Sequence, residues 1–268
     1  MSRPLFKQQG KRPILVCSLT DDNPAELQAT IRNAIFDGAD GFLLHTEKLQ
    51  EKYRNRESLK RIFDMTQGRP VMSLNYRYDR NLTSEELMDF QFEAVLAGAA
   101  CVDMPADIYG KKFGLADPDC GYTDLRSAVA KQKAFAAAVH AEGAQVLSSY
   151  HQFGPYFDSE IVLKRTKSMA ARGADFIKVA QNIEREDQLP DAVKTTIRMN
   201  RELPVPSFHI LFGKYGRALR PLSPIFGSCM VLCVQRYTVA GHKDKPLLRA
   251  TRDLFNNLDF EIDPREEK

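Results

Sequence analysis

A short glycine-containing motif recurs three times in the chain, each time between an amphipathic segment and an apolar run. It reads Gly-Ala-Asp at 38–40 and 173–175, and Gly-Ala-Ala at 98–100. Glycine is typical of the end of a helix, because it adopts the left-handed backbone conformation without a steric cost. The unbroken apolar run that follows each motif indicates a strand buried on both faces, as in a parallel sheet covered by helices. The motif therefore predicts repeated helix–turn–strand units.

The same alternation extends over the whole chain. Apolar runs predict eight strands, at residues 13–19, 41–45, 70–77, 100–104, 144–150, 175–180, 205–212 and 225–234. Amphipathic segments predict helices at residues 24–37, 56–66, 84–97, 124–142, 158–173, 184–201 and 244–257. Asn23 is the expected N-cap of the first helix, with Pro24 at its first position. Thr83, followed three residues later by Glu86, predicts a capping box.

Eight strands, most of them followed by a helix, favour a single-domain (β/α)8 TIM barrel over residues 1–268, with its core at about 13–258. A doubly wound open sheet is the alternative, but no glycine-rich dinucleotide or phosphate loop follows any strand. Residues 105–123 form a longer connection than is usual after a strand. In a barrel, the chemistry is expected at the C-terminal ends of the strands.

Composition and charge exclude several classes of protein. A net charge of +3 with dispersed basic residues gives no indication of nucleic-acid binding, and no apolar stretch of 18 residues indicates a membrane span. The five cysteines, at positions 17, 101, 120, 229 and 233, contain no Cys-x-x-Cys pair. That spacing argues against a disulfide framework and against a zinc site, so we expect a protein of the reducing cytoplasm.

Lys178 is the most informative polar residue, because it interrupts the apolar run DFIKVA. Burial disfavours the charged form and lowers the pKa of a lysine, and a neutral amine can attack a ketone to form a Schiff base. The alternative is a lysine that extends from a strand end to water. His151 ends the preceding strand, about 5 Å away in a parallel sheet, and could carry protons for such a reaction. Its alternative is a histidine hydrogen-bonded to the backbone.

Other polar residues also stand at predicted strand ends. Arg77 and Arg220 follow the third and seventh strands, and two guanidinium groups at a barrel mouth would suit a substrate carboxylate. Taken singly, each is more often a surface or salt-bridge arginine. Ser18, His45 and Asp103 occupy comparable positions after the first, second and fourth strands.

These stretches resemble the type I 3-dehydroquinate dehydratase family. The resemblance rests on three segments in the same order: SSYHQF at 148–153, GADFIKVA at 173–180 and GKYGRALRPLSPIFGS at 213–228. PILVCSLTDDNPAEL at 13–27 is similar to the first strand and helix of the family, and SLNYR at 73–77 to its third strand. It extends over nearly the whole chain, and the His–Lys pair in its context is its most specific part.

The resemblance implies a lyase that forms a Schiff base and needs neither metal nor organic cofactor. Lys178 would form the imine with 3-dehydroquinate and His151 would act as general acid and base, giving 3-dehydroshikimate in the shikimate pathway of aromatic amino acid biosynthesis. Arg77 and Arg220 would bind the substrate, with Thr238 and His242 in a covering loop. The family also implies a homodimer, with no nucleic-acid or membrane partner.

The departures from the family pattern fall on substrate contacts and on the support of His151. The second-strand Glu-x-Arg of the family aligns with Leu43 and His45, and the glutamate after its third-strand arginine aligns with Asn81. The loop glutamine is His242, the fourth-strand Asp-x-Glu ends at Pro105, and the residue after His151 is Gln152 instead of Asp. We therefore weigh three hypotheses: a dehydratase of 3-dehydroquinate or a related carboxylated cyclic ketone, another lysine-imine lyase or aldolase, and an inactive barrel with a binding role.

Overall fold

A computed structural model describes residues 3–75, 82–110, 121–152, 154–238, 244–258 and 260. Its eight strands are β1 (Ile14–Leu19), β2 (Gly41–His45), β3 (Val71–Leu74), β4 (Cys101–Pro105), β5 (Gln145–Gln152), β6 (Phe176–Asn182), β7 (Ser207–Phe212) and β8 (Met230–Cys233). Its α-helices are α1 (Pro24–Phe36), α2 (Arg56–Asp64), α3 (Ser84–Ala97), α4 (Arg126–Ala141), α5 (Ser159–Ala170), α6 (Leu189–Glu202), α7 (Gly213–Gly216) and α8 (Leu248–Asn256).

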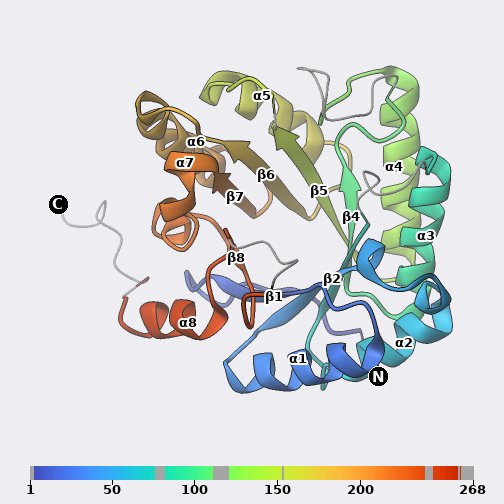
Figure 1. Cartoon of the computed structure of the whole chain (residues 1–268). Coiled ribbons are helices and arrows are strands. Elements are labelled where there is room, and N and C mark those ends of the chain that lie inside the picture. Colours follow the sequence, from blue (N-terminus) through green and yellow to red (C-terminus); the bar gives the residue numbers. More distant parts are fainter. Residues whose placement is uncertain are drawn as a thin grey trace.

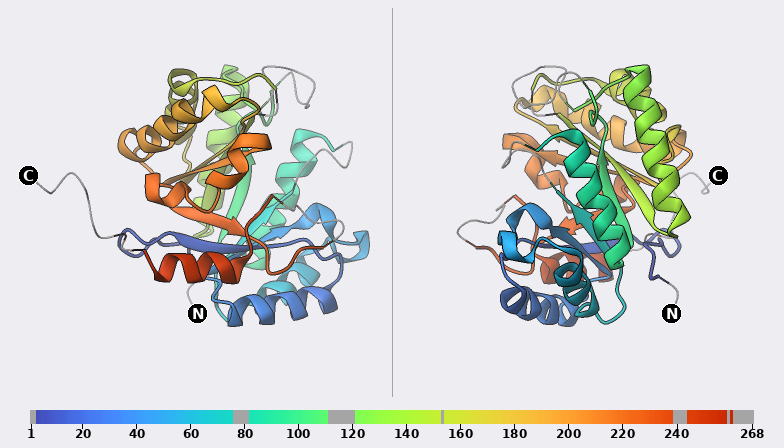
Figure 2. Two further views of the ribbon diagram at one scale, coloured as in Figure 1. Left: turned by 60° about the vertical axis from the view of Figure 1, so that its left-hand side comes forward. Right: turned by 90° about the vertical axis from the view of Figure 1, so that its right-hand side faces the viewer.

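All of the strand pairs are parallel, in the order β7-β6-β5-β4-β3-β2-β1-β8, and the helices surround the sheet on its outside (Figures 1 and 2). The two ends of this order, β7 and β8, meet at a backbone hydrogen bond of 2.8 Å from Cys229 N, next to β8, to Ser207 O of β7. The sheet is thus a nearly closed (β/α)8 barrel, which confirms the predicted fold class. We call the junction of β7 and β8 the seam.

The recurring glycine motif has the conformation that the sequence predicts. Gly38, Gly98 and Gly173 have φ values of 89°, 112° and 94°, in the left-handed region. The aspartates of the motif have a second role, because Asp40 accepts a hydrogen bond from Leu15 N at 2.8 Å. Asp175 accepts one from Val146 N at 2.7 Å. The motif therefore ends a helix and also fixes the start of the neighbouring strand.

Two further local predictions are confirmed, and three element boundaries differ by four residues or more. Asn23 caps α1 and Thr83 forms the capping box of α3. The segment 184–201 becomes α-helical only at Leu189, after a 3-10 turn at Glu186–Gln188. Pro190 lies in the first turn of the α-helix, where its missing backbone N–H is tolerated. In segment 225–234 only Met230–Cys233 is strand, since a 3-10 turn at Ser223–Phe226 precedes it.

The third difference concerns the last helix, which begins at Leu248 and not at residue 244. Pro246 lies in this segment, and the residue before a proline is disfavoured in the helical conformation. Residues around Leu247 instead bridge Val234 in parallel, with a hydrogen bond from Val234 N to Pro246 O at 3.0 Å. This pairing holds the segment just before α8 against the C-terminal end of β8.

The barrel interior is apolar at its N-terminal end and polar at its C-terminal end. Side chains from alternate strand positions, among them Leu43, Met72 and Phe176, form one buried cluster with Phe6. Phe6 is only 1% exposed, and its backbone is held by two hydrogen bonds with the Gln145 side chain, at 2.9 and 3.1 Å. The N-terminal segment therefore plugs the bottom of the barrel.

A second, larger core lies between the outer face of the sheet and the helices. Cys17, Cys101, Cys229 and Cys233 are buried free thiols, as expected for small core residues, and Cys120 lies outside the described residues. Residues 111–120 of the long connection also lie outside them. No helix in the described ranges is both long and apolar enough to cross a membrane.

Candidate active site

The central strands bring Lys178 and His151 to the same side of the sheet. In the parallel register of β5 and β6, Ser149 pairs with Lys178 and His151 pairs with Ala180. Because side chains alternate between the two faces of a strand, His151 and Lys178 both point into the barrel, one step apart. Lys178 is 2% exposed and His151 is 5% exposed. The lysine therefore does not extend to water, and the buried interpretation of the sequence holds.

The environment of Lys178 favours its neutral form. Burial lowers the pKa of the Lys178 amine, and the positive charge of Arg220 lowers it further, while the carboxylates of Asp103 and Glu47 oppose this effect. A lysine with a lowered pKa has a larger fraction of nucleophilic amine at neutral pH. Lys178 thus has the chemical character that imine formation requires.

His151 is kept neutral by the same surroundings. Burial lowers its pKa well below the usual value, and the charge of Lys178 lowers it further. This second effect requires that the two side chains lie close together inside the barrel. A neutral imidazole next to an amine can accept a proton from the amine or from a bound substrate.

Asp103 provides the negative charge opposite Lys178. It lies on β4 and is 1% exposed. Burial raises the pKa of Asp103, and the nearby charge of Lys178 lowers it. The aspartate and the lysine are therefore electrostatically coupled across β5.

Arg220 lies in the turn after β7 and is 6% exposed. Its guanidinium forms an ion pair with Asp244, which follows β8. The sequence predicted Arg220 as a cation for a substrate carboxylate. In the structure its side chain lies at the barrel mouth and is ion-paired with a carboxylate of the protein itself, Asp244.

A hydrogen-bonded chain that the sequence did not predict crosses the ends of β1 and β2. Lys245 donates to Ser18 Oγ at 3.0 Å and contacts His45 Nε2 at 3.3 Å. His45 Nδ1 in turn lies 2.9 Å from Glu47 Oε1. The side chains of the four residues are all buried, with exposed fractions of 6% or less. A proton on Nδ1 directed at the carboxylate leaves Nε2 as the acceptor for Lys245.

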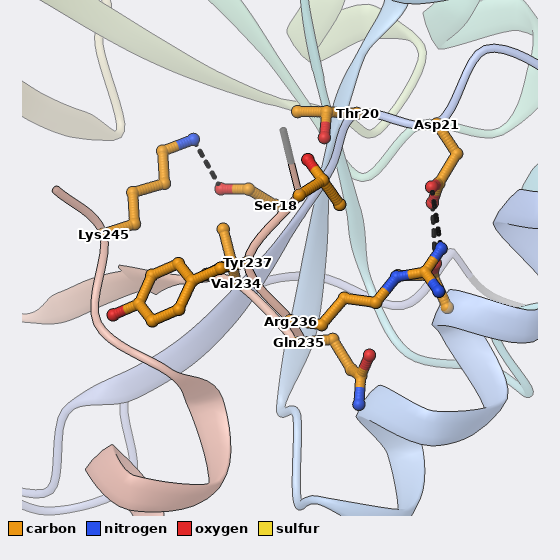
Figure 3. A pocket seen from close by; sticks show the side chains of 10 residues that line it. Ser18, Thr20, Asp21, Val234, Gln235, Arg236, Tyr237 and Lys245 are labelled. Atoms are coloured by element: carbon orange, nitrogen blue, oxygen red, sulfur yellow. Dashed lines mark hydrogen bonds and ion pairs between the residues drawn. The ribbon is translucent and has the colours of Figure 1, made fainter. Parts of the chain in front are cut away.

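A pocket opens beside this chain. It is lined by Ser18, Thr20, Asp21, Thr30, Val234, Gln235, Arg236, Tyr237, Thr238 and Lys245. Figure 3 shows Lys245 directed at the Ser18 hydroxyl, while Arg236 and Asp21 form an ion pair of 3.6 Å on another wall. Thr238, which the resemblance assigned to a covering loop, is half-buried and belongs to this pocket.

The structure describes only some of the other residues that the sequence analysis singled out. Arg77, Asn81 and His242 lie outside the described residues. Leu43, at the position of a family glutamate, is fully buried in the apolar interior. Gln152 donates through its side-chain amide to the Pro155 carbonyl, and this contact turns it toward the following loop.

Sequence reasoning missed Lys245, Glu47 and Asp244. Lys245 and Asp244 belong to the charged run HKDKP, which the sequence assigned to the start of a helix. Pro246 was the signal that could have shown otherwise. Glu47 follows His45 by two residues, but nothing in the sequence distinguishes it from a surface glutamate. Within the described ranges, no group of three or more His, Cys, Asp or Glu side chains is arranged to hold a metal ion.

Several solved structures have a fold similar to that of this chain. Type I 3-dehydroquinate dehydratase from Clostridium difficile, solved with covalently modified comenic acid, is 15% identical with a TM-score of 0.76, covering 93% of each chain. The 3-dehydroquinate dehydratase from Geobacillus kaustophilus HTA426 is 14% identical with a TM-score of 0.75, covering 95% of this chain and 97% of the other. The α-subunit of tryptophan synthase from Pyrococcus furiosus, at 13% identity, is also similar, with a TM-score of 0.59, covering 94% of this chain and 100% of the other.

The structure defines a TIM barrel with a lysine, Lys178, and a histidine, His151, buried on neighbouring strands. Residues 112–237, a little under half of the chain, match the family model for type I 3-dehydroquinase. In this segment and in its fold, the chain is similar to the type I 3-dehydroquinases. A search of curated proteins by sequence gave no match.

Proposed function

We propose that this protein is a Schiff-base-forming dehydratase that acts on 3-dehydroquinate or on a related carboxylated cyclic ketone. The observation that carries the proposal is the buried pair of Lys178 and His151, in which burial lowers both pKa values. The match of residues 112–237 to the family model for type I 3-dehydroquinase supports the reaction class. The departures at Leu43, His45 and Asn81 are the reason for including related ketones in the substrate class.

The reaction begins at the amine of Lys178. Neutral Lys178 Nζ attacks the ketone carbon, and the carbinolamine loses water to form a protonated imine. His151 transfers the protons that this step requires. The positive imine withdraws electrons from the adjacent carbon, which lowers the cost of removing a proton there.

Elimination and release follow at the same two residues. His151 removes the proton next to the imine carbon and the resulting electron pair expels the β-hydroxyl group, which leaves as water after taking up a proton. Hydrolysis of the imine then releases the conjugated enone and restores Lys178. Asp103 stabilises the positive charge on Lys178 through space during these steps, because it is a buried carboxylate close to that charge.

The binding of the substrate uses the remaining polar groups at the mouth. Arg220 and Arg77 are proposed to bind substrate as the family resemblance implies, with Ser18, His45, Asn81, Thr238 and His242 as further contacts. A homodimer in the cytoplasm is also part of the proposal. Light scattering after size-exclusion chromatography would measure the mass in solution, and a monomer would contradict that part.

Borohydride trapping tests the proposed reaction. The protein is incubated with 3-dehydroquinate and reduced, and the peptide that contains Lys178 is examined by mass spectrometry for the reduced adduct. We expect the adduct and the absorbance of the product enone. Lys178→Ala should abolish both, whereas Lys194→Ala, at an exposed lysine on α6, should leave them unchanged.

The other outcomes separate the alternatives. An adduct with another ketone, but not with 3-dehydroquinate, would indicate a different lysine-imine reaction such as an aldol cleavage. Failure with a broad panel of ketones would indicate an inactive barrel and would contradict the proposal.

A further inference from the structure

We propose that Lys245, which lines the pocket next to Ser18, is the residue that binds the substrate carboxylate with its ammonium group. The inference rests on the proposed function, because it concerns the substrate of the same site. It assigns a role to a residue that the family resemblance does not include.

The partners of Lys245 leave its positive charge without a carboxylate. An ammonium group has three N–H donors, and Lys245 uses two of them, toward the Ser18 hydroxyl and His45 Nε2. Within the part of the chain that the structure describes, its third donor has no partner and its ammonium forms no ion pair. A buried cation of this kind is costly unless an anion accompanies it.

The groups around Lys245 increase this demand for an anion. Ser18 contacts it from β1 and His45 from β2, while Arg220 and Lys178 add positive charge from the turn after β7 and from β6. Asp244, the preceding residue, is the carboxylate that acts on it through space, and Asp244 is already paired with Arg220. Burial first, and then the charges of Arg220 and Lys178, lower the pKa of Lys245 to about 7.

The same contacts indicate which of the two cations, Lys245 or Arg220, binds the substrate carboxylate. Arg220 holds the carboxylate of Asp244, so a substrate carboxylate would have to displace it. Lys245 holds only a hydroxyl and an imidazole, and it lines the pocket (Figure 3). A carboxylate placed there can accept from the ammonium without breaking an existing ion pair, while Arg220 contributes its charge from a distance.

The test uses two probes that cannot form an imine. Quinate is a cyclic hydroxy acid without a ketone, and its carboxamide has the same ring without the charge. Calorimetric titration of the wild-type protein should give at least about tenfold tighter binding of quinate than of the amide, the effect of one charge-assisted hydrogen bond. Lys245→Met should remove this ratio, and Lys245→Arg should retain most of it.

Asp244→Asn is the matched variant, because it frees Arg220 and leaves Lys245 in place. It should keep the ratio of the wild-type protein. If Asp244→Asn instead raises the affinity for quinate tenfold and Lys245→Met has no effect, the carboxylate binds Arg220 and the inference is wrong. A wild-type protein that binds neither probe, or that does not distinguish them, also overturns it.

Proton uptake provides a readout that does not depend on a variant. At pH 8 an amine with a pKa of about 7 is about nine-tenths neutral, and pairing with a carboxylate raises its pKa. Quinate binding should therefore take up close to one proton, measured from the dependence of the binding heat on the ionisation enthalpy of the buffer. No uptake by the wild-type protein would contradict the inference, even if Lys245→Met fails to fold.

Trapping of 3-dehydroquinate on Lys178, run in parallel, separates the two proposals. If 3-dehydroquinate is not trapped but quinate still binds more tightly than its amide, the proposed dehydratase reaction is contradicted and carboxylate binding by Lys245 is supported. If 3-dehydroquinate is trapped but quinate binds no more tightly than its amide, the role of Lys245 is contradicted and the proposed dehydratase reaction is supported.

Discussion

Asp103 and Lys178 lie on strands β4 and β6, with β5 between them, and their charges act on each other inside the barrel. Each opposes the effect of burial on the other, so each favours the ionised form of its partner. At the neighbouring His151, burial and the positive charge of Lys178 both lower the pKa and so favour the neutral form. The site thus combines a lysine whose pKa is lowered by burial, in part offset by Asp103, with a neutral histidine.

Replacement of Asp103 by Asn tests this coupling. The change removes the largest effect that raises the pKa of Lys178, so the pKa should fall further. The rate of borohydride trapping rises with pH until the amine is neutral, and this rise should occur at lower pH in Asp103→Asn than in the wild-type protein. Asp253→Asn, at an exposed position on α8, should leave the profile unchanged. A shift to higher pH would show that Asp103 does not stabilise the ammonium.

Replacement of His151 by Ala should separate imine formation from turnover. General acid–base catalysis contributes about 10²–10⁴-fold, so the rate of enone formation should fall within that range. Lys178 remains in place, and some trapped adduct should still accumulate. Single-turnover kinetics with borohydride quenching would measure both. Equal loss of trapping and turnover would indicate that His151 serves only to hold Lys178.

The buried amine of Lys245 should make stability depend on pH. Its pKa is about 7 in the folded protein and about 10.4 in an unfolded chain, so the unfolded state binds more protons between these values. The free energy of unfolding contributed by this group should therefore rise by about 2 kcal/mol from pH 7 to pH 9. Urea denaturation of the wild-type protein and Lys245→Met at both pH values would measure the difference, which should be smaller in the variant by this amount.

The plug at the bottom of the barrel should be a major source of stability. Phe6→Ala removes a side chain that is 1% exposed, which should lower the free energy of unfolding by about 3–5 kcal/mol. Phe36→Ala on α1, where the side chain is 86% exposed, should change it by less than about 0.5 kcal/mol. Chemical denaturation of both variants provides the comparison. Equal effects would mean that the N-terminal segment does not support the barrel.

The sequence predicted the fold because its local signals agreed. The left-handed glycines, the caps at Asn23 and Thr83 and the apolar strands all point to the same repeated unit, and the structure confirms them. Lys178 was recognisable because a charged residue is conspicuous in an apolar strand.

The rest of the site depends on contacts between distant segments. Lys245 reaches Ser18 across 227 positions of the chain, and Asp244 reaches Arg220 across 24. Lys245 and Asp244 are ordinary charged residues in the sequence. The pairing of Val234 with Leu247 holds the segment that follows them against the end of β8, and a periodicity argument does not contain that pairing.

The ion pair of Arg220 and Asp244 also acts as a clasp across the seam. Arg220 follows β7 and Asp244 follows β8, the two strands at the ends of the sheet order. At the opposite end of the seam, Cys229 N bonds to Ser207 O. A ligand that drew Arg220 away from Asp244 would therefore weaken the closure of the barrel between β7 and β8 at its C-terminal end. A ligand bound by Lys245 leaves this ion pair, and with it the closure of the barrel, intact during the reaction.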